Sequence, residues 1–171
     1  MKLDRLFLFG LFVAVCVPPT DARLIEVWSY DQYVAASDLV AVVEPVQNHP
    51  ASDRFPDAPS RYHLGDFEAT DTLFKVHTTF KAKGNPPQSL TVLHFSYSKQ
   101  ATNTMNGGLF IQFPVENRTA KSAFGPDARL EGKKYLAFLK KRSDERFEPV
   151  RGQYDARLAF RELREPGPQG D

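Results

Sequence analysis

The sequence predicts a mainly β protein in which a compact antiparallel sheet closes into a barrel, with one or two short helices beside it. Five or six short to medium runs of apolar or alternating residues are separated by polar turns. These runs do not alternate with helical segments, as βαβ units would require. A chain of 171 residues is also small enough that closure would remove exposed sheet edges. The period-two pattern alone fits a sandwich equally well.

The first 22 residues have the pattern of a secretory signal peptide. Lys2 and Arg5 precede an apolar run over residues 6–17, and Ala22 supplies the small residue of a cleavage site. This run is shorter than the roughly 20 residues that span a bilayer. We therefore expect cleavage near Ala22, a secreted or periplasmic location, and no membrane span.

The expected mature chain is one domain over residues 23–163 with a disordered tail over residues 164–171. Cys16 is the only cysteine, so cleavage leaves neither disulfides nor thiol chemistry. Lipidation of Cys16 is disfavoured because the bulky Val15 precedes it. The formal net charge of +1 argues against a nucleic-acid binder or a polybasic membrane binder.

A short helix and a strand are expected first in the mature domain. Ser29 and Gln32 have the spacing of a capping box, which predicts a helix that ends by residue 37. Residues 39–46 are almost continuously apolar and β-branched, which predicts a strand covered on both faces. Residues 47–66 contain three prolines and are expected to form a long exposed loop.

A hairpin is expected in the middle of the chain. Residues 67–80 alternate with period two, which predicts a long strand, and a turn at residues 84–87 leads into a second strand over residues 90–95. Residues 96–108 are polar, end in Gly107-Gly108, and predict another loop.

The C-terminal third predicts further short elements. Residues 109–113 form an apolar run and are a fourth strand candidate. Residues 133–141 alternate into a fifth strand, which turns at residues 142–145 into residues 147–150. Residues 155–163 fit either a short helix or a strand.

The order of these elements resembles the netrin-like domain of the tissue inhibitors of metalloproteinases. The segments that carry the resemblance are residues 36–43, 72–84, 90–95, 131–139 and 147–153. Cysteine-free, uncharacterised secreted bacterial proteins of the same layout are more similar still. The resemblance implies an OB-like five-stranded antiparallel barrel with one or two short flanking helices.

The inhibitory mechanism of that family does not carry over. Its members chelate the protease zinc through a cysteine at the mature N-terminus, whereas the expected mature N-terminus here begins at Arg23 and no cysteine follows it. We therefore carry over the fold alone.

The sequence contains no recognised catalytic motif. Signatures of serine hydrolases, zinc peptidases, nucleotide-binding loops and dithiol redox enzymes are all missing. We therefore expect no catalytic residues, no cofactor and no enzyme activity. The remaining enzyme hypothesis is that the protein has an unfamiliar catalytic site, which would lie in a deep pocket.

The four histidines are candidate metal ligands. His77 and His94 fall on neighbouring predicted strands, where they could meet, but two histidines alone rarely make a site and each is expected to lie partly exposed beside threonines. His49 and His63 share the long loop with three aspartates, without a spacing that would force them together. We therefore predict no metal site.

Aromatic residues in predicted loops are the binding candidates. Phe55, Tyr62 and Tyr97 lie in or beside irregular segments, where aromatic side chains can anchor a partner or simply cover the end of a barrel. Six lysines at strand ends are expected to be solvated and to discourage edge pairing. The tripeptide at Asn117 is a glycosylation sequon by pattern.

These observations favour a noncatalytic binding module of unknown ligand. Its expected contact surface is formed by the loops over residues 47–66 and 96–108, because loops on a rigid scaffold carry function, and the expected partner is another protein. The alternatives are a protease inhibitor that uses the same end of the barrel, and an enzyme with an unrecognised site.

Overall fold

The protein is described by a computed structural model that covers residues 25–56, 66–101, 108–115 and 132–164. The expected signal peptide, the tail beyond Arg164, Tyr62 and Asn117 lie outside these residues. The elements, in chain order, are α1 (Tyr30–Ala36), β1 (Leu39–Ala51), β2 (Phe67–Ala82), β3 (Ser89–Tyr97), β4 (Lys134–Lys141), β5 (Phe147–Pro149), the 3₁₀ helix η2 (Gln153–Ala159) and β6 (Phe160–Leu163). None of the helices in the described part of the chain is long and apolar enough to cross a membrane.

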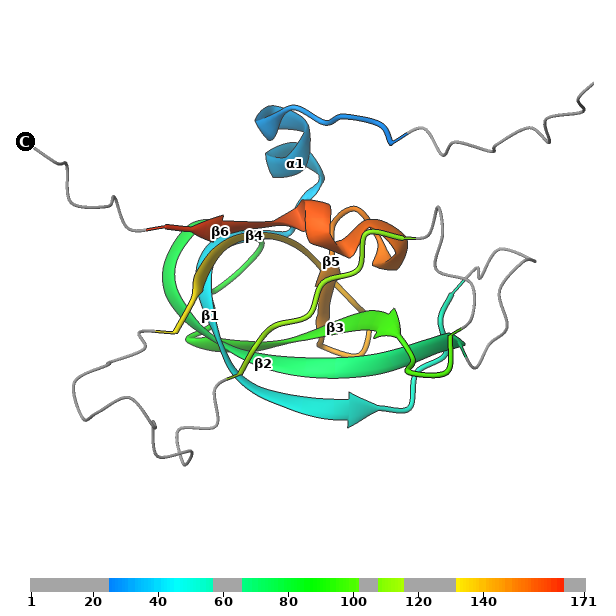
Figure 1. The fold of residues 1–171 in the computed structure, drawn as a ribbon. Coiled ribbons are helices and arrows are strands. Elements are labelled where there is room, and N and C mark those ends of the chain that lie inside the picture. Colours follow the sequence, from blue (N-terminus) through cyan, green and yellow to red (C-terminus); the bar gives the residue numbers. More distant parts are fainter. Residues whose placement is uncertain (1–24, 57–65, 102–107, 116–131, 165–171) are drawn as a thin grey trace, which may run out of the picture.

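Five strands close into a barrel (Figure 1). The neighbours run in the order β1-β2-β3-β5-β4, and β4 pairs again with β1, while β6 extends the sheet beyond β4. The fold class predicted from the sequence is confirmed, with one refinement. The barrel is mixed, because β3 and β5 run parallel where Val92 pairs with Phe147.

The predicted helix forms with the capping box that its sequence encodes. The Gln32 amide donates to Ser29 Oγ at 3.3 Å, and the Ser29 amide donates to Gln32 Oε1 at 2.7 Å. Tyr33 is the buried residue of α1. It packs with Val40 and Phe138, which pair across β1 and β4, and so fixes α1 against the outside of the barrel.

The first strand is longer than expected. Residues 47–51 were predicted to belong to a loop, but β1 continues to Ala51 and stays paired with β2. Among described strands, β4 pairs only with residues 39–43 of β1, so the later half of β1 has one neighbouring strand. A strand with one open edge tolerates Pro45 and Pro50, which donate no backbone hydrogen bond.

The predicted fourth strand at residues 109–113 is wrong. Residues 108–115, which we call the strap, form no strand, and Figure 1 shows them crossing the barrel from the side of η2. Phe113 is 2% exposed and packs with Phe74 and Phe160 in the barrel core. The apolar run therefore marks a core plug, since periodicity cannot distinguish a buried strand from a buried irregular segment.

The remaining elements follow the predictions. The hairpin of β2 and β3 is antiparallel, with Phe67 opposite Tyr97 and Lys75 opposite Ser89. Residues 147–149 form β5 after the predicted turn. Residues 155–163 contain both predicted alternatives, because η2 ends at Ala159 and β6 begins at Phe160.

Candidate functional site

The outer face of β2 and β3 is covered by the protein's own aromatic residues. Here Leu93 and Phe95 form a buried cluster with Phe55, which is 6% exposed. The Phe55 ring stacks on Phe67 with centroids 4.2 Å apart. The aromatic cluster therefore covers this part of the outer face.

Two of the predicted binding aromatics belong to this packing. Phe55 lies at the centre of the cluster, and Tyr97 meets Phe110 edge-on with centroids 4.8 Å apart. Packing accounts for both side chains, and their contact with a partner stays a prediction. Tyr62 lies outside the described residues.

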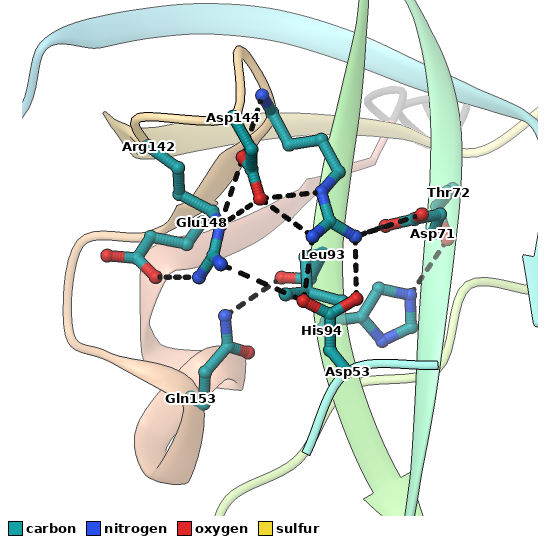
Figure 2. Close-up of polar contacts among 10 residues, drawn as sticks. Asp53, Asp71, Thr72, Leu93, His94, Arg142, Asp144, Glu148 and Gln153 are labelled. Atoms are coloured by element: carbon teal, nitrogen blue, oxygen red, sulfur yellow. Dashed lines mark hydrogen bonds and ion pairs between the residues drawn. The ribbon is translucent and has the colours of Figure 1, made fainter. Parts of the chain in front are cut away.

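A group of charged side chains fastens the segment after β1 to the barrel. We call it the ionic clamp, and its members are Asp53, Asp71, Arg142, Asp144, Arg146 and Glu148. Figure 2 shows Asp53, Asp71 and Asp144 arranged around one guanidinium group. Arg146 Nη2 lies 2.7 Å from both Asp53 Oδ1 and Asp144 Oδ2, and its Nη1 lies 2.9 Å from Asp71 Oδ1. One arginine thereby joins three chain segments.

The clamp favours the ionised forms of Asp53 and Asp144. The Arg146 guanidinium lowers the pKa of Asp53 and lowers the pKa of Asp144 to about 2. The same hydrogen bonds raise the pKa of Arg146. Bidentate arginine and carboxylate pairs combine charge with fixed geometry. The clamp therefore sets the position at which the chain leaves the barrel after β1.

A groove of about 620 Å³ lies where the two predicted contact loops begin. Its walls are residues 48–53, residues 67–70, His94 and Ser96 of β3, and residues 112–113 of the strap. Asp53 and Glu68 line it, and neither lysine nor arginine does so among the described residues. Asp53 is held by Arg146, whereas the Glu68 carboxylate has no ion-pair partner among described residues. The groove therefore favours neutral or basic ligands that donate hydrogen bonds.

His94 belongs to a buried hydrogen-bond chain beneath this groove. Asn48 Nδ2 donates to the Phe113 carbonyl at 2.8 Å, which turns Asn48 Oδ1 toward Thr72. The Thr72 hydroxyl donates to that oxygen at 2.6 Å. Since the hydroxyl has one proton, it accepts from His94 Nε2, which lies 2.8 Å away. We therefore assign the neutral Nε2–H tautomer to His94.

Burial keeps His94 uncharged. The residue is 2% exposed, and desolvation lowers its pKa to about 4. The backbone of Ile111 favours the protonated form, but no hydrogen bond of acceptable geometry reaches Nδ1. Nδ1 is thus an unpaired acceptor. Thr72 is fully buried and already donates to Asn48, so His94 is not placed to take a proton from it.

The two histidines on neighbouring strands do not meet. His94 lies opposite Thr70, whereas His77 Nε2 lies 2.7 Å from Glu44 Oε2. His94 is also not the partly exposed residue expected from the sequence, because its side of β3 faces the interior. In the described ranges no group of three or more potential ligands could hold a metal ion.

The segment before α1 is held by an arginine that the sequence did not single out. Arg151 Nη2 donates to the Glu26 carbonyl at 3.1 Å, and its guanidinium lies 4.3 Å from the Trp28 ring centroid. The Arg151 side chain is 8% exposed. This contact fixes residues 26–28 beside α1.

Sequence reasoning also missed the clamp and the buried histidine chain. Arg146 is far from Asp53 and Asp71 in the sequence, and charged residues in turns are commonly solvated. The period-two pattern of β3 is the signal that could have placed His94 inside, since Val92 and His94 share one strand face. No family model matches the chain, and no curated protein matches it.

Proposed function

We propose that the protein is a noncatalytic binding module that holds a segment of another protein in the groove. The observation that carries this proposal is the convergence of two segments expected to make contacts. Residues 48–53 and Ser96, from the beginnings of the two predicted loops, line one cavity. A secreted or periplasmic location and a netrin-like relationship are parts of the proposal that rest on the sequence.

The charges of the groove indicate what kind of segment it would hold. Glu68 offers a carboxylate without an ion-pair partner among described residues. A basic side chain or a backbone amide could complement this acceptor. A phosphate backbone would meet only acidic charges here, which supports a protein partner over a nucleic acid.

The geometry favours binding over catalysis. Thr72 accepts from His94, so the hydroxyl and imidazole are not arranged as a nucleophile and its base. Thr72 also has no exposed surface at which a substrate could react. A rigid wall of buried polar groups instead supports recognition, because its geometry is fixed before the ligand arrives.

A peptide-display selection tests the proposal. The purified protein is immobilised, binders are selected from a random library, and their affinities are measured for two matched variants. Thr70→Arg fills the groove, whereas Thr78→Arg places the same side chain on an exposed position of β2 outside it. We expect enrichment of basic peptides whose affinity falls at least about tenfold, or 1.4 kcal/mol, with Thr70→Arg only. Equal binding by both variants, or no enriched peptide, would contradict the groove assignment.

Protease inhibition is the second candidate function. The observation that favours it is the anchored segment at residues 26–28, because a fixed N-terminal segment is a prerequisite for inserting a chain end into a protease. The test is inhibition of a panel of zinc and serine proteases by the purified protein and by Arg151→Ala. Inhibition that weakens in the variant would support this function, and no inhibition by either protein would exclude it for the panel.

A further inference from the structure

A second cavity lies along the strap and differs from the groove in the sign of its charged lining. Its volume is about 760 Å³, and part of its wall is apolar. Leu109, Ile111 and Pro114 contribute from the strap, Leu158 from η2 and Phe160 from β6. We call it the basic pocket, because its charged lining is mostly cationic. Only Gln112 lines both cavities.

Four cationic side chains line the basic pocket, against one carboxylate. The cationic residues are Lys133, Arg157, Arg161 and Arg164, and the carboxylate is Glu162. Lys133 Nζ lies 3.1 Å from Glu162 Oε1, so the one acidic group that lines the pocket in the described part of the chain is already paired. The other three cations face this cavity without a carboxylate of its lining to neutralise them. The pocket therefore has an uncompensated positive potential.

Two of these arginines have no protein partner within the described residues. The Arg157 side chain makes no ion pair or hydrogen bond with the described residues. Its backbone amide donates to the Leu109 carbonyl at 2.8 Å. The Arg164 side chain is likewise unpaired in the same ranges. Arg161 differs, because its guanidinium lies 5.7 Å from the Tyr33 ring centroid. Arg157 and Arg164 are therefore the groups available to an anion.

A buried phenol adds a neutral donor to the same pocket. Tyr135 is 6% exposed and lines the cavity, and its hydroxyl has no hydrogen-bond partner among the described residues. Burial, together with the charge of Glu162, raises the pKa of Tyr135, so the hydroxyl keeps its proton. A protonated phenol can donate a hydrogen bond to an anionic oxygen.

We propose that the basic pocket binds an amphipathic organic anion, such as an alkyl or aryl carboxylate or phosphate monoester. Arg157, Arg164 and the Tyr135 hydroxyl receive the anionic group, and the apolar wall from the strap, Leu158 and Phe160 receives the hydrocarbon part. The combination of an apolar wall with a few polar groups is typical of small-molecule sites. This site is separate from the proposed peptide groove.

Isothermal titration calorimetry with three probes tests the proposal. Hexyl phosphate carries both features, inorganic phosphate carries charge alone, and hexylammonium carries the hydrocarbon with the opposite charge. We expect hexyl phosphate to bind at least about tenfold more tightly than inorganic phosphate, and hexylammonium not to bind, since charge and apolar burial both contribute. Equal affinity for the two phosphates, or no binding of hexyl phosphate, would overturn the proposal.

Matched variants locate the site. The Arg157→Gln/Arg164→Gln double variant should weaken hexyl phosphate binding at least about tenfold. The control is Arg54→Gln/Lys99→Gln, which removes two exposed cations that do not line the pocket. Equal weakening by the control would show nonspecific attraction and overturn the assignment.

Two further variants keep the result interpretable. Tyr135→Phe preserves the buried ring and should also weaken hexyl phosphate binding. An unchanged affinity would contradict a contact between the Tyr135 hydroxyl and the anion. Thr70→Arg, which fills the groove, should bind hexyl phosphate as the unmodified protein does. Loss of binding there would place the anion in the groove and overturn the proposal, independently of the peptide result.

Discussion

Arg146 and Asp53, which are 93 residues apart in the sequence, meet through two nearly parallel hydrogen bonds. Arg146 Nη1 lies 2.9 Å from Asp53 Oδ2, and Nη2 lies 2.7 Å from Oδ1. The turn between β4 and β5 is thereby fixed to the segment that leaves β1. This pair limits how far the groove wall at Asp53 can move.

Replacing Arg146 should destabilise the fold. Arg146→Ala leaves Asp53, Asp71 and Asp144 without their shared cation, so we expect a loss of about 1–2 kcal/mol in the free energy of unfolding, measured by urea titration. High salt should reduce this loss, because the side chains are partly exposed. The control Arg54→Ala should stay within about 0.5 kcal/mol of the unmodified protein. An equal effect of both variants would contradict the role of the clamp.

His94 should make the protein sensitive to acid between pH 6.5 and pH 4. The unfolded chain binds a proton at a pKa near 6.5, whereas folding lowers the His94 pKa to about 4. His94 therefore makes its full contribution to the free energy of unfolding above pH 6.5. This contribution falls by about 3 kcal/mol as the pH is lowered to 4. Unfolding titrations across this range should show the slope, and His94→Gln should remove it.

The surface histidine supplies the control for this prediction. His77→Gln changes a residue that pairs with Glu44 and lies away from the buried chain. It should leave the slope between pH 6.5 and pH 4 in place. Asp53 and Asp144 contribute in a lower window, because their lowered pKa values make stability fall only as pH drops below about 3.8. A slope that survives His94→Gln would contradict the assignment.

The hydrogen-bond chain predicts the tautomer of His94. Long-range ¹H–¹⁵N spectra above pH 6.5 should show a protonated Nε2 and an unprotonated Nδ1. Thr72→Val leaves Nε2–H buried without its acceptor, so we expect a loss of about 1–3 kcal/mol in unfolding free energy. Thr78→Val, on an exposed position of the same strand, should have little effect. A protonated Nδ1 would contradict the chain of donors.

Phe113 should hold the strap in place. Phe113→Ala removes a ring that contacts Phe74, Tyr135 and Phe160, so we expect a loss of about 3–5 kcal/mol in unfolding free energy. Phe80→Ala is the matched control, since Phe80 is 66% exposed, and should cost less than about 0.5 kcal/mol. Similar costs for the two variants would show that the strap does not depend on this ring.

Local patterns predicted the elements that local chemistry specifies. The capping residues Ser29 and Gln32 located α1, and period-two alternation located β2 and β4. These signals depend on neighbours within a few residues, so they can be read without the fold. The same rules failed at residues 47–51, where one edge of β1 has no neighbour among the described strands and therefore tolerates proline.

The candidate site depends on contacts that no local pattern records. Arg146 finds Asp71, and Asn48 orients Thr72 and His94, only after the barrel has closed. The strand prediction at residues 109–113 was wrong for a related reason. An apolar run indicates that a segment is buried. Whether that segment pairs as a strand depends on the tertiary structure.

Closure of the barrel through β1 and β4 also has a kinetic consequence. Leu39 pairs with Leu139 and Val43 with Tyr135, so this seam joins segments nearly a hundred residues apart. Such non-local pairing forms slowly, after the local hairpin of β2 and β3. Until β4 arrives, residues 39–43 present an uncharged, β-branched edge that can pair with another copy of the chain. We therefore expect aggregation during refolding to rise with protein concentration and to compete with completion of the seam.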